Sequence, residues 1–297
     1  MYNTNMKIYS ELNENFHLSL ALGFFDGVHL GHKKVIESAV NFAKKNGNKS
    51  AIITFKEHPY CYLHGVCPKY IVLNKVREDK FKELGIDYVY ELNFEDISKF
   101  SAAEYFKDIL IKYFKPVSIS TGWNHYFGEN KSGNSNFLKN KSSQYGYEYF
   151  ETEPVKFNNE IINSTSIRKY LSEGKIEKAN KMLGYNFSVN GKVVKGNQIG
   201  RTIGFKTANI TYPSELIEIP YGVYSVNTNF GKAIANFGIR PTVNGSKPIL
   251  EVHILNFDQD IYGEQIDIEF FKMLRTEIKF SSIDELKVQI LKDILSI

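Results

Sequence analysis

The first half of the chain alternates short apolar runs with segments of helical period. Residues 18–23 and 51–55 are apolar runs of strand length, and residues 31–45 between them carry apolar side chains at helical spacing. The same criteria predict further strands at 88–92 and 117–120 and further helices at 75–84 and 102–113. Strands that alternate with helices pair in parallel through right-handed crossovers, so this half predicts an open α/β sheet. Ligands of such sheets bind beyond the carboxyl ends of the strands.

The pattern changes after residue 163. Two short helices are expected at 164–172 and 176–183. Short strands punctuated by turn residues then follow, and they are expected at 189–194, 208–212, 222–227, 233–237, 250–256 and 265–271. This spacing predicts a small antiparallel barrel. The chain is therefore expected to form two domains, 1–183 and 184–297.

A terminal amphipathic helix is expected after Ser282-Ile283-Asp284-Glu285, which has the pattern of a capping box. Its apolar positions fall on one helical face and are Ile283, Leu286, Ile290 and Ile294.

Composition narrows the class of protein. The chain has 297 residues, of which 42% are hydrophobic, and a net charge of +4 that is too small and dispersed to indicate a nucleic-acid partner. No apolar run approaches the ~20 residues that span a bilayer, and residues 1–10 lack the apolar core of a secretory signal. Two cysteines provide no disulfide framework. These features predict a cytoplasmic protein with no membrane partner.

The segment Gly23–His32 follows the first strand and opens the first helix. Its glycines let backbone approach a ligand closely, and a helix N-terminus offers N–H groups and partial positive charge to a phosphate. His29 and His32 are three residues apart, so both can point at one phosphate chain and stabilise charge that develops during transfer at an α-phosphorus. Metal ligation and an ordinary surface helix start are the alternative interpretations of this histidine pair.

Embedded in Gly-x-Phe-Asp-Gly-Val-His-x-Gly-His after the first strand, the pair resembles the N-terminal module of prokaryotic bifunctional riboflavin kinase/FAD synthetases, a Rossmann-like branch of the nucleotidyltransferases. Thr54–Pro59, Gly122–Gly128 and Asn163–Arg168 resemble further motifs of that family in the same order. The resemblance implies His29 and His32 as catalytic residues. It implies ATP contacts from Gly23, Phe24, Asp26, Gly31, Asn124, Ser164, Thr165 and Arg168, and flavin contacts from Phe55 and His58.

Some of these motifs have simpler interpretations or depart from the family. Ser164 and Thr165 also suit a helix N-terminus, a role compatible with phosphate binding. Lys56 replaces an acidic residue, His125 an aromatic residue and Asn163 a small hydroxyl residue. These changes bear on substrate affinity more than on the type of reaction.

A second candidate site lies in the strand-rich half. Glycines and basic residues at 196–204 form a loop whose N–H groups can cover phosphates. Thr207 and Asn209 then supply oxygen ligands of the kind that Mg²⁺ prefers. Glu251, in a strand between apolar residues, can serve as general base for phosphoryl transfer. Taken singly, Thr207 and Asn209 are also common turn formers, and Glu251 is also an ordinary exposed strand residue.

As a set, these residues resemble the riboflavin kinase module of the same family. The set continues in Gly222–Tyr224, Arg240–Val243, Tyr262–Gly263 and Leu274–Arg275. The resemblance implies Mg²⁺ at Thr207 and Asn209, Glu251 as base, ATP contacts from Gly196, Arg201 and Gly204, and Arg275 near the flavin. Lys206 stands where the family has a proline. Proline would preorganise the following threonine, so lysine either loosens the loop or adds a phosphate contact.

One more set of residues can bind metal. His58, Cys61, His64 and Cys67 recur at every third position, but this is not the spacing of common zinc sites.

Three functional hypotheses follow. The chain is an enzyme that phosphorylates riboflavin to FMN and adenylylates FMN to FAD with release of pyrophosphate, with riboflavin, FMN and ATP as its small-molecule partners. Alternatively it retains one of these activities, or it is a regulator that binds flavin or nucleotide without turnover. The sequence leaves the oligomeric state open.

Overall fold

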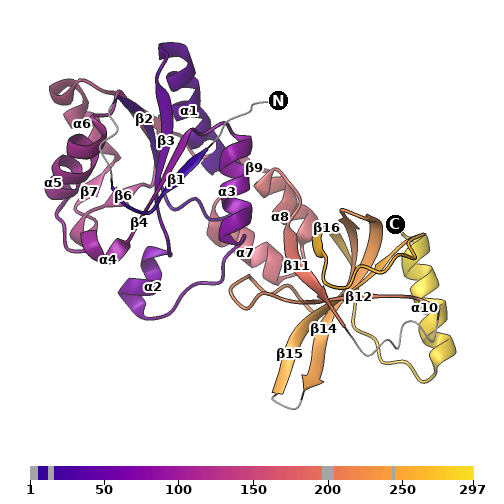
Figure 1. Cartoon of the computed structure of the whole chain (residues 1–297). Helices are drawn as coiled ribbons and strands as arrows, with labels where there is room; N and C mark the ends of the chain where they lie inside the picture. The colour runs from indigo at the N-terminus through magenta and orange to yellow at the C-terminus, as the bar shows by residue number, and fades with distance from the viewer. Residues whose placement is uncertain (1–5, 13–16, 196–203, 243–244) are drawn as a thin grey trace. The chain divides into compact units, whose positions relative to one another are not determined.

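The computed structural model describes residues 6–12, 17–195, 204–242 and 245–297. Proximity of Cα atoms divides the chain into two compact units. The first contains residues 1–68 and 73–163, and the second contains residues 69–72 and 164–297. Figure 1 shows a layered α/β unit and a β-barrel unit.

The first unit is built on a six-stranded sheet in the order β1-β4-β3-β2-β5-β8, in which every pairing is parallel. Its strands are β1 (Lys7–Tyr9), β2 (Leu18–Leu22), β3 (Lys49–Phe55), β4 (Tyr88–Leu92), β5 (Ser118–Gly122) and β8 (Glu148–Thr152). The predicted parallel sheet is confirmed. The patterns missed the edge strands β1 and β8 because neither has a fully buried residue.

Helices cover both faces of this sheet (Figure 1). On one face α1 (Leu30–Asn46) and α3 (Asn74–Glu83) pack over β2, β3 and β4 around Ile36, Ile52 and Phe81. On the other face lie α4 (Phe94–Ile97), α5 (Ala102–Glu104), η1 (Tyr105–Phe114) and α6 (Ser135–Tyr145). The helix expected at 102–113 continues after one α turn as the π-helix η1, whose wider spacing buries Ile109 and Phe114 together.

The order of the strands fixes where a ligand binds. The chain runs from β2 outward to β3 and β4, then returns to place β5 on the other side of β2. Ala21 of β2 pairs with Ile52 of β3 and with Ser120 of β5, so the strand order reverses at β2. The carboxyl ends of β2 and β5 therefore flank the crevice in which open α/β sheets bind ligands.

Short helices and strands lie in the connections that follow β3, β5 and β8. They are α2 (Pro59–His64), β6 (Tyr126–Phe127), η2 (Glu129–Lys131), β7 (Gly133–Asn134), β9 (Lys156–Phe157) and β10 (Glu160–Ile161). β6 pairs with β7, and β9 pairs with β10.

The second unit begins with α7 (Ser164–Ser172) and α8 (Ile176–Leu183) and continues as a closed barrel in the order β11-β12-β15-β14-β13-β16. The barrel strands are β11 (Ser188–Val194), β12 (Ala208–Thr211), β13 (Gly222–Thr228), β14 (Gly231–Thr242), β15 (Gly245–Ile254) and β16 (Gln265–Thr276). All their pairings are antiparallel, so the predicted barrel is confirmed. The domain boundary at 183/184 stays a prediction. By the distances between Cα atoms, residues 164–183 belong to the same compact unit as the barrel.

The terminal helix α10 (Ile283–Leu295) begins where the sequence predicts. The Ser282 hydroxyl accepts from the Glu285 N–H, and the Glu285 carboxylate reaches back to the N–H of Ser281. Ile283 is 60% exposed, so it does not share the half-buried face of the other three predicted apolar positions. At its far end α10 is fixed to β16 through Asp293, which accepts from the guanidinium of Arg275.

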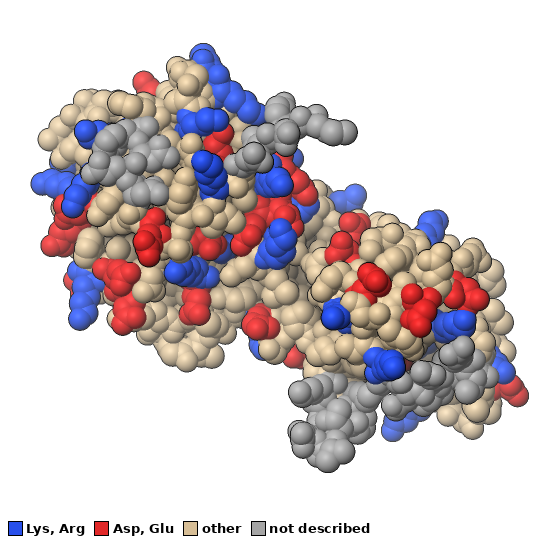
Figure 2. Space-filling view, in the orientation of Figure 1, with Lys and Arg blue, Asp and Glu red and all other residues tan. Residues whose placement is uncertain are grey.

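Charge on the surface agrees with the low net charge of the sequence. On the face shown in Figure 2, basic and acidic side chains are intermixed in both units.

Candidate active sites

The loop between β2 and α1 has an unusual backbone. Phe25, Gly27 and Val28 have φ angles of 59°, 78° and 33°. A positive φ is uncommon for phenylalanine and an outlier for a β-branched valine, and such strain concentrates at functional sites. Burial of the Phe25 and Val28 side chains against α1 and α3 holds the loop in this shape. The first candidate site is thus a rigid loop at the crevice beside β2.

The two predicted histidines lie together at the end of this loop. His29 is the N-cap of α1, and its Nδ1 accepts from the backbone N–H of His32 at 3.2 Å. Because Nδ1 accepts, the neutral ring carries its hydrogen on Nε2, where it can donate. The two imidazole rings stack with centroids 3.6 Å apart. Both rings lie beside the N–H groups that open α1, with His29 only 4% exposed and Nδ1 of His32 buried. A histidine pair at the N-terminus of a helix suits a phosphate chain.

Two of the predicted glycines are explained by these rings. A Cβ at Gly31 would lie 3.1 Å from Cε1 of His29, and a Cβ at Gly23 would lie 2.9 Å from the ring of Phe25. Glycine therefore lets both rings fold back over the backbone. Asp26, also predicted here, is buried.

Arg77 of α3 anchors the loop, and the sequence analysis missed it. Its guanidinium donates to the Phe24 carbonyl at the end of β2, to the Phe55 carbonyl at the end of β3, and to Glu91 of β4 at 3.0 Å. It also lies 4.6 Å from the centre of the Phe24 ring. Arg77 is 1% exposed, and this burial lowers its pKa. One buried cation thus fixes the carboxyl ends of three neighbouring strands, which a pattern of apolar spacing cannot reveal.

We expect Arg77→Ala to destabilise the first unit by roughly 3 kcal/mol, because it leaves the partly buried Glu91 carboxylate without its ion pair. Chemical denaturation followed by tryptophan fluorescence measures this loss. Lys75→Ala is the matched control, since its ion pair with Asp79 is exposed and such pairs contribute ~0–1 kcal/mol. Equal effects of the two substitutions would contradict the anchoring role.

The loop after β5 carries Asn124 on the other side of the crevice. Asn124 is exposed, and its Oδ1 would lie 3.4 Å from a Cβ placed at Gly122. His125 turns inward and stacks on Phe127 at 5.8 Å between centroids. Its Nε2 is buried and has no hydrogen-bond partner among the described residues, and burial lowers the pKa of His125 to about 4. The histidine therefore packs as the aromatic residue that the family has at this position.

His125 makes the stability of this unit depend on pH. A histidine in an unfolded chain has a pKa of about 6.5, so between about pH 6.5 and 4 the unfolded chain binds a proton that the folded one excludes. The free energy of unfolding is therefore not reduced by His125 above pH 6.5, and it falls as the pH drops toward 4. In His125→Phe we expect this fall in the free energy of unfolding to be smaller by on the order of 2 kcal/mol. Denaturation curves at pH 7 and pH 4.5 test it, and an unchanged pH dependence in the variant would refute it.

A pocket of about 460 Å³ opens at the carboxyl ends of β3 and β4. It is lined by Lys56, Glu57, His58, Cys61, Tyr62, Gly65, Val66, Cys67, Asn93, Phe94 and Glu95. His58 caps α2 through its Nδ1 and contacts the ring of Phe24 at 4.6 Å, which links the pocket to the β2–α1 loop. Phe55 packs edge-to-face on Phe94 in the pocket wall. Both residues with predicted flavin contacts in the first half of the chain therefore adjoin this pocket.

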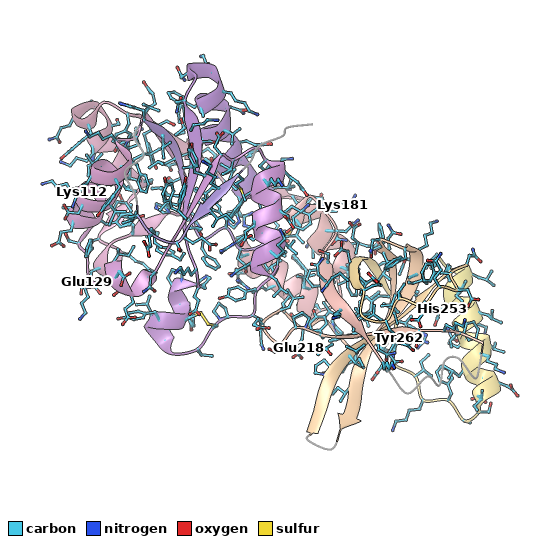
Figure 3. The ribbon with its side chains drawn as sticks, in the orientation of Figure 1. Lys112, Glu129, Lys181, Glu218, His253 and Tyr262 are labelled. Carbon is cyan, nitrogen blue, oxygen red and sulfur yellow. A yellow bond between two sulfur atoms is a disulfide. The ribbon has the colours of Figure 1, made fainter. Side chains whose placement is uncertain are left out.

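The two cysteines are joined to each other in the pocket wall. Cys61 and Cys67 form a disulfide, with Cα atoms 4.3 Å apart, which Figure 3 draws in yellow. The sequence predicts no disulfide framework, and the structure joins the two cysteines in a single bond. The left-handed Gly65, which turns the chain back after α2, brings them together. Among the described residues the two sulfurs group with Glu57 and with neither His58 nor His64, so the alternative of a four-residue metal site is not supported.

Three predicted ATP contacts belong to α7 in the second unit. Ser164 and Thr165 open this helix, and Arg168 donates from Nε to the carbonyl of Lys69 at 2.9 Å. Their role in ATP binding stays a prediction.

The second candidate site is a row of side chains across the barrel wall. Asn209 of β12 lies directly opposite Glu251 of β15, which lies directly opposite Asn236 of β14. The neighbours of Glu251 in the strand, Leu250 and Val252, are fully buried inside the barrel, so the row lies on the outer face. Asn209 is nevertheless 4% exposed. The predicted metal ligand and the predicted base are thus adjacent, and Asn236 is a further polar neighbour that the sequence analysis missed.

The segment before Asn209 is held against β15. His253, labelled in Figure 3, contacts the carbonyl of Lys206 through Nδ1 at 2.8 Å, and its ring packs edge-on to Phe205. The Lys206 ammonium pairs with Asp258. An ion pair and a side-chain contact therefore restrain the loop where the family has a proline.

Of the other residues predicted around the kinase site, Gly204 has a φ of 90°, and Gly196, Arg201 and Val243 lie outside the described residues.

Arg275 lies on the same outer row, beyond Val223, which pairs with both Asn236 and Arg275. Three inter-strand steps separate it from Glu251, a distance of roughly 14 Å. Its guanidinium makes a forked contact with Asp293 of α10 at 2.8 to 3.1 Å. The predicted flavin contact thus holds α10 on the barrel, and its part in binding flavin stays a prediction.

Comparisons with known proteins match both halves of the chain. A family model described as FAD synthetase matches residues 12–166, and one described as riboflavin kinase matches residues 183–297. A bifunctional riboflavin kinase/FMN adenylyltransferase of Buchnera aphidicola subsp. Schizaphis graminum is 38% identical over 94% of this chain and 93% of its own. The Escherichia coli K12 protein of that name is 31% identical over 93% and 90%. The chain belongs to the bifunctional riboflavin kinase/FMN adenylyltransferase family.

Membership of this family confirms the resemblance found in the sequence motifs. A solved structure from Streptococcus pneumoniae, titled a macrolide-efflux protein, has the same architecture with a TM-score of 0.88, 31% identity and 97% coverage of both chains. Within the part of our chain that the structure describes, every helix is too short or too polar to cross a membrane.

Proposed function

We propose that the first unit joins the adenylyl group of ATP to FMN at the crevice beside β2. The β2–α1 loop and the N-terminus of α1 hold the phosphates of ATP. The phosphate of FMN attacks the α-phosphorus, a new P–O bond forms, and pyrophosphate leaves. The acceptor is already an anion, so no side chain has to remove a proton, and His29 and His32 donate to the charge that develops on the oxygens.

The pocket at the ends of β3 and β4 suits the flavin of FMN. Its volume of about 460 Å³ lies in the range of small-molecule sites, and aromatic rings from Tyr62 and Phe94 line it. His58 and Phe24 stand between this pocket and the phosphate loop. A flavin here would direct its phosphate toward the histidines. Asn124, across the crevice, is proposed as a contact for the adenosine of ATP.

The barrel unit is proposed to phosphorylate riboflavin on its outer face. Glu251 accepts the proton of the ribityl hydroxyl as its oxygen attacks the γ-phosphorus of ATP, and ADP leaves. Asn209 and Asn236 flank this carboxylate on the neighbouring strands. The strand register carries this proposal, because it places a candidate base directly beside a candidate ligand of the ATP-bound metal.

Mg²⁺ is proposed as the metal of the kinase reaction. The Thr207 hydroxyl and the Asn209 amide oxygen fit this ion, which prefers oxygen ligands and completes its shell with water and phosphate. Bound there, it would neutralise charge on the transferring phosphates. A cytoplasmic location, where ATP is available, is proposed with it.

Separate substrates test the proposed function. FMN and ATP with Mg²⁺ should give FAD and pyrophosphate without ADP, whereas riboflavin and ATP with Mg²⁺ should first give FMN and ADP. Chromatography of flavins and nucleotides distinguishes these products, and a chelator should stop the kinase step. FAD in neither mixture would refute the bifunctional proposal, and failure of one mixture alone would indicate a single retained activity.

A further inference from the structure

The disulfide lies in the wall of the pocket. Five of the residues that line this pocket come from the segment 61–67, and both sulfurs are among them. The other lining residues directly follow two strands of the sheet, since 56–58 come immediately after β3 and 93–95 immediately after β4. The segment 61–67 is the wall that lies farther along the chain from a strand.

This wall is exposed, and the ring of Tyr62 packs edge-to-face on Phe94 with centroids 5.9 Å apart. α2 has six residues, none of which is buried, and Leu63 and Val66 are 60% and 62% exposed. A helix this short is unstable without tertiary contacts. Two local hydrogen bonds stabilise the ends of α2. The Gly65 N–H donates to the Cys61 carbonyl, and the Tyr60 N–H donates to Nδ1 of His58. The covalent bond from Cys61 to Cys67 is what closes the segment into one loop.

We propose that Cys61 and Cys67 form a thiol–disulfide site whose oxidation state sets the affinity of this pocket for FMN. In the oxidised state the wall is closed and the pocket is preformed. In the reduced state the segment samples open conformations, so only a fraction of molecules binds FMN at once. The proposal rests on the proposed role of the pocket in the adenylyl transfer.

The chemistry requires a small-molecule disulfide as oxidant. One protein thiolate attacks this disulfide and releases one small thiol, and the second protein thiolate then displaces the other. A bond forms between the two Sγ atoms, both thiol protons are lost, and two electrons pass to the oxidant, which leaves as two thiols. A small dithiol reverses the reaction. Glu57, whose carboxylate lies within 4.8 Å of both sulfurs, is an anion that would disfavour both thiolates and so slow this exchange.

The chain provides its own control, because these are its only two cysteines. A redox treatment can act on no other thiol, and riboflavin phosphorylation on the barrel reports any general damage. We expect reduction to raise the KM for FMN in FAD formation by about three- to tenfold and to leave riboflavin phosphorylation unchanged. Cys61→Ser/Cys67→Ser should show the higher KM under all conditions. Alkylation followed by mass spectrometry should count two thiols after reduction and none after oxidation.

The same FMN KM in both redox states, or a redox response that persists in the double serine variant, would overturn the proposal. If the protein forms no FAD at all, the proposed function fails, and the quenching of FMN fluorescence on binding then decides the inference separately. Binding that weakens on reduction supports the redox site, and binding that ignores the redox state overturns it. Cys67→Ser alone, which disturbs one position only, should bind FMN as the reduced protein does.

Discussion

His32→Ala is expected to lower the rate of FAD formation from FMN by about a hundred- to a thousandfold while FMN still forms from riboflavin. The substitution removes one of two stacked donors beside the N-terminus of α1. It keeps the backbone N–H of residue 32, which donates to His29, so the cap of α1 survives. The expected result is a chain that folds and accumulates FMN.

Rates of FAD and FMN formation measured on the same preparation test this prediction. His17→Asn is the matched control, because it also removes a histidine from the first unit but lies exposed before β2, and asparagine tolerates its left-handed backbone. It should leave both rates within about twofold of wild type, as most exposed substitutions do. Loss of both activities in folded His32→Ala protein would show that the two steps share a site.

Glu251→Ala is expected to have the converse effect and to lower riboflavin phosphorylation by about a hundred- to ten-thousandfold. Supplied FMN should still be adenylylated at the wild-type rate. Its strand neighbours Leu250 and Val252 fill the interior of the barrel, whereas Glu251 lies outside, so the substitution removes no core contact. Glu251→Gln should fail similarly, because an amide keeps the shape of the side chain but cannot accept the proton.

Glu264→Ala serves as control for the barrel, since Glu264 is an exposed carboxylate before β16. Both flavin steps should proceed normally in it. If Glu251→Gln retained most of the phosphorylation rate, the carboxylate would not be the base, and Glu251 would have a structural role beside Asn209 and Asn236.

Apolar spacing predicted the central strands and helices because these elements bury several residues each. β2, for example, is buried at every position, and α1 buries five residues at helical spacing. The short or half-exposed elements β1, β8 and α2 were missed for the opposite reason. The spacing of short strands also predicted the barrel, but the order of its strands depends on pairings between segments far apart in the chain, which this spacing does not encode.

Site residues that are close together in the sequence were predicted. Site residues that only the fold brings together were missed. His29 and His32 stand three residues apart, so one turn of chain brings them together. Arg77, in contrast, reaches carbonyls of Phe24 and Phe55 from another helix, and Asn236 meets Glu251 only through strand register. The disulfide needed the turn at Gly65.

The most direct test of two independent sites in one chain is a mixture of the two variants. With riboflavin, ATP and Mg²⁺, His32→Ala alone should stop at FMN, and Glu251→Ala alone should form no product. Mixed, they should form FAD, because the first supplies FMN to the adenylylating unit of the second. A mixture that forms no FAD, although Glu251→Ala adenylylates added FMN, would contradict the account.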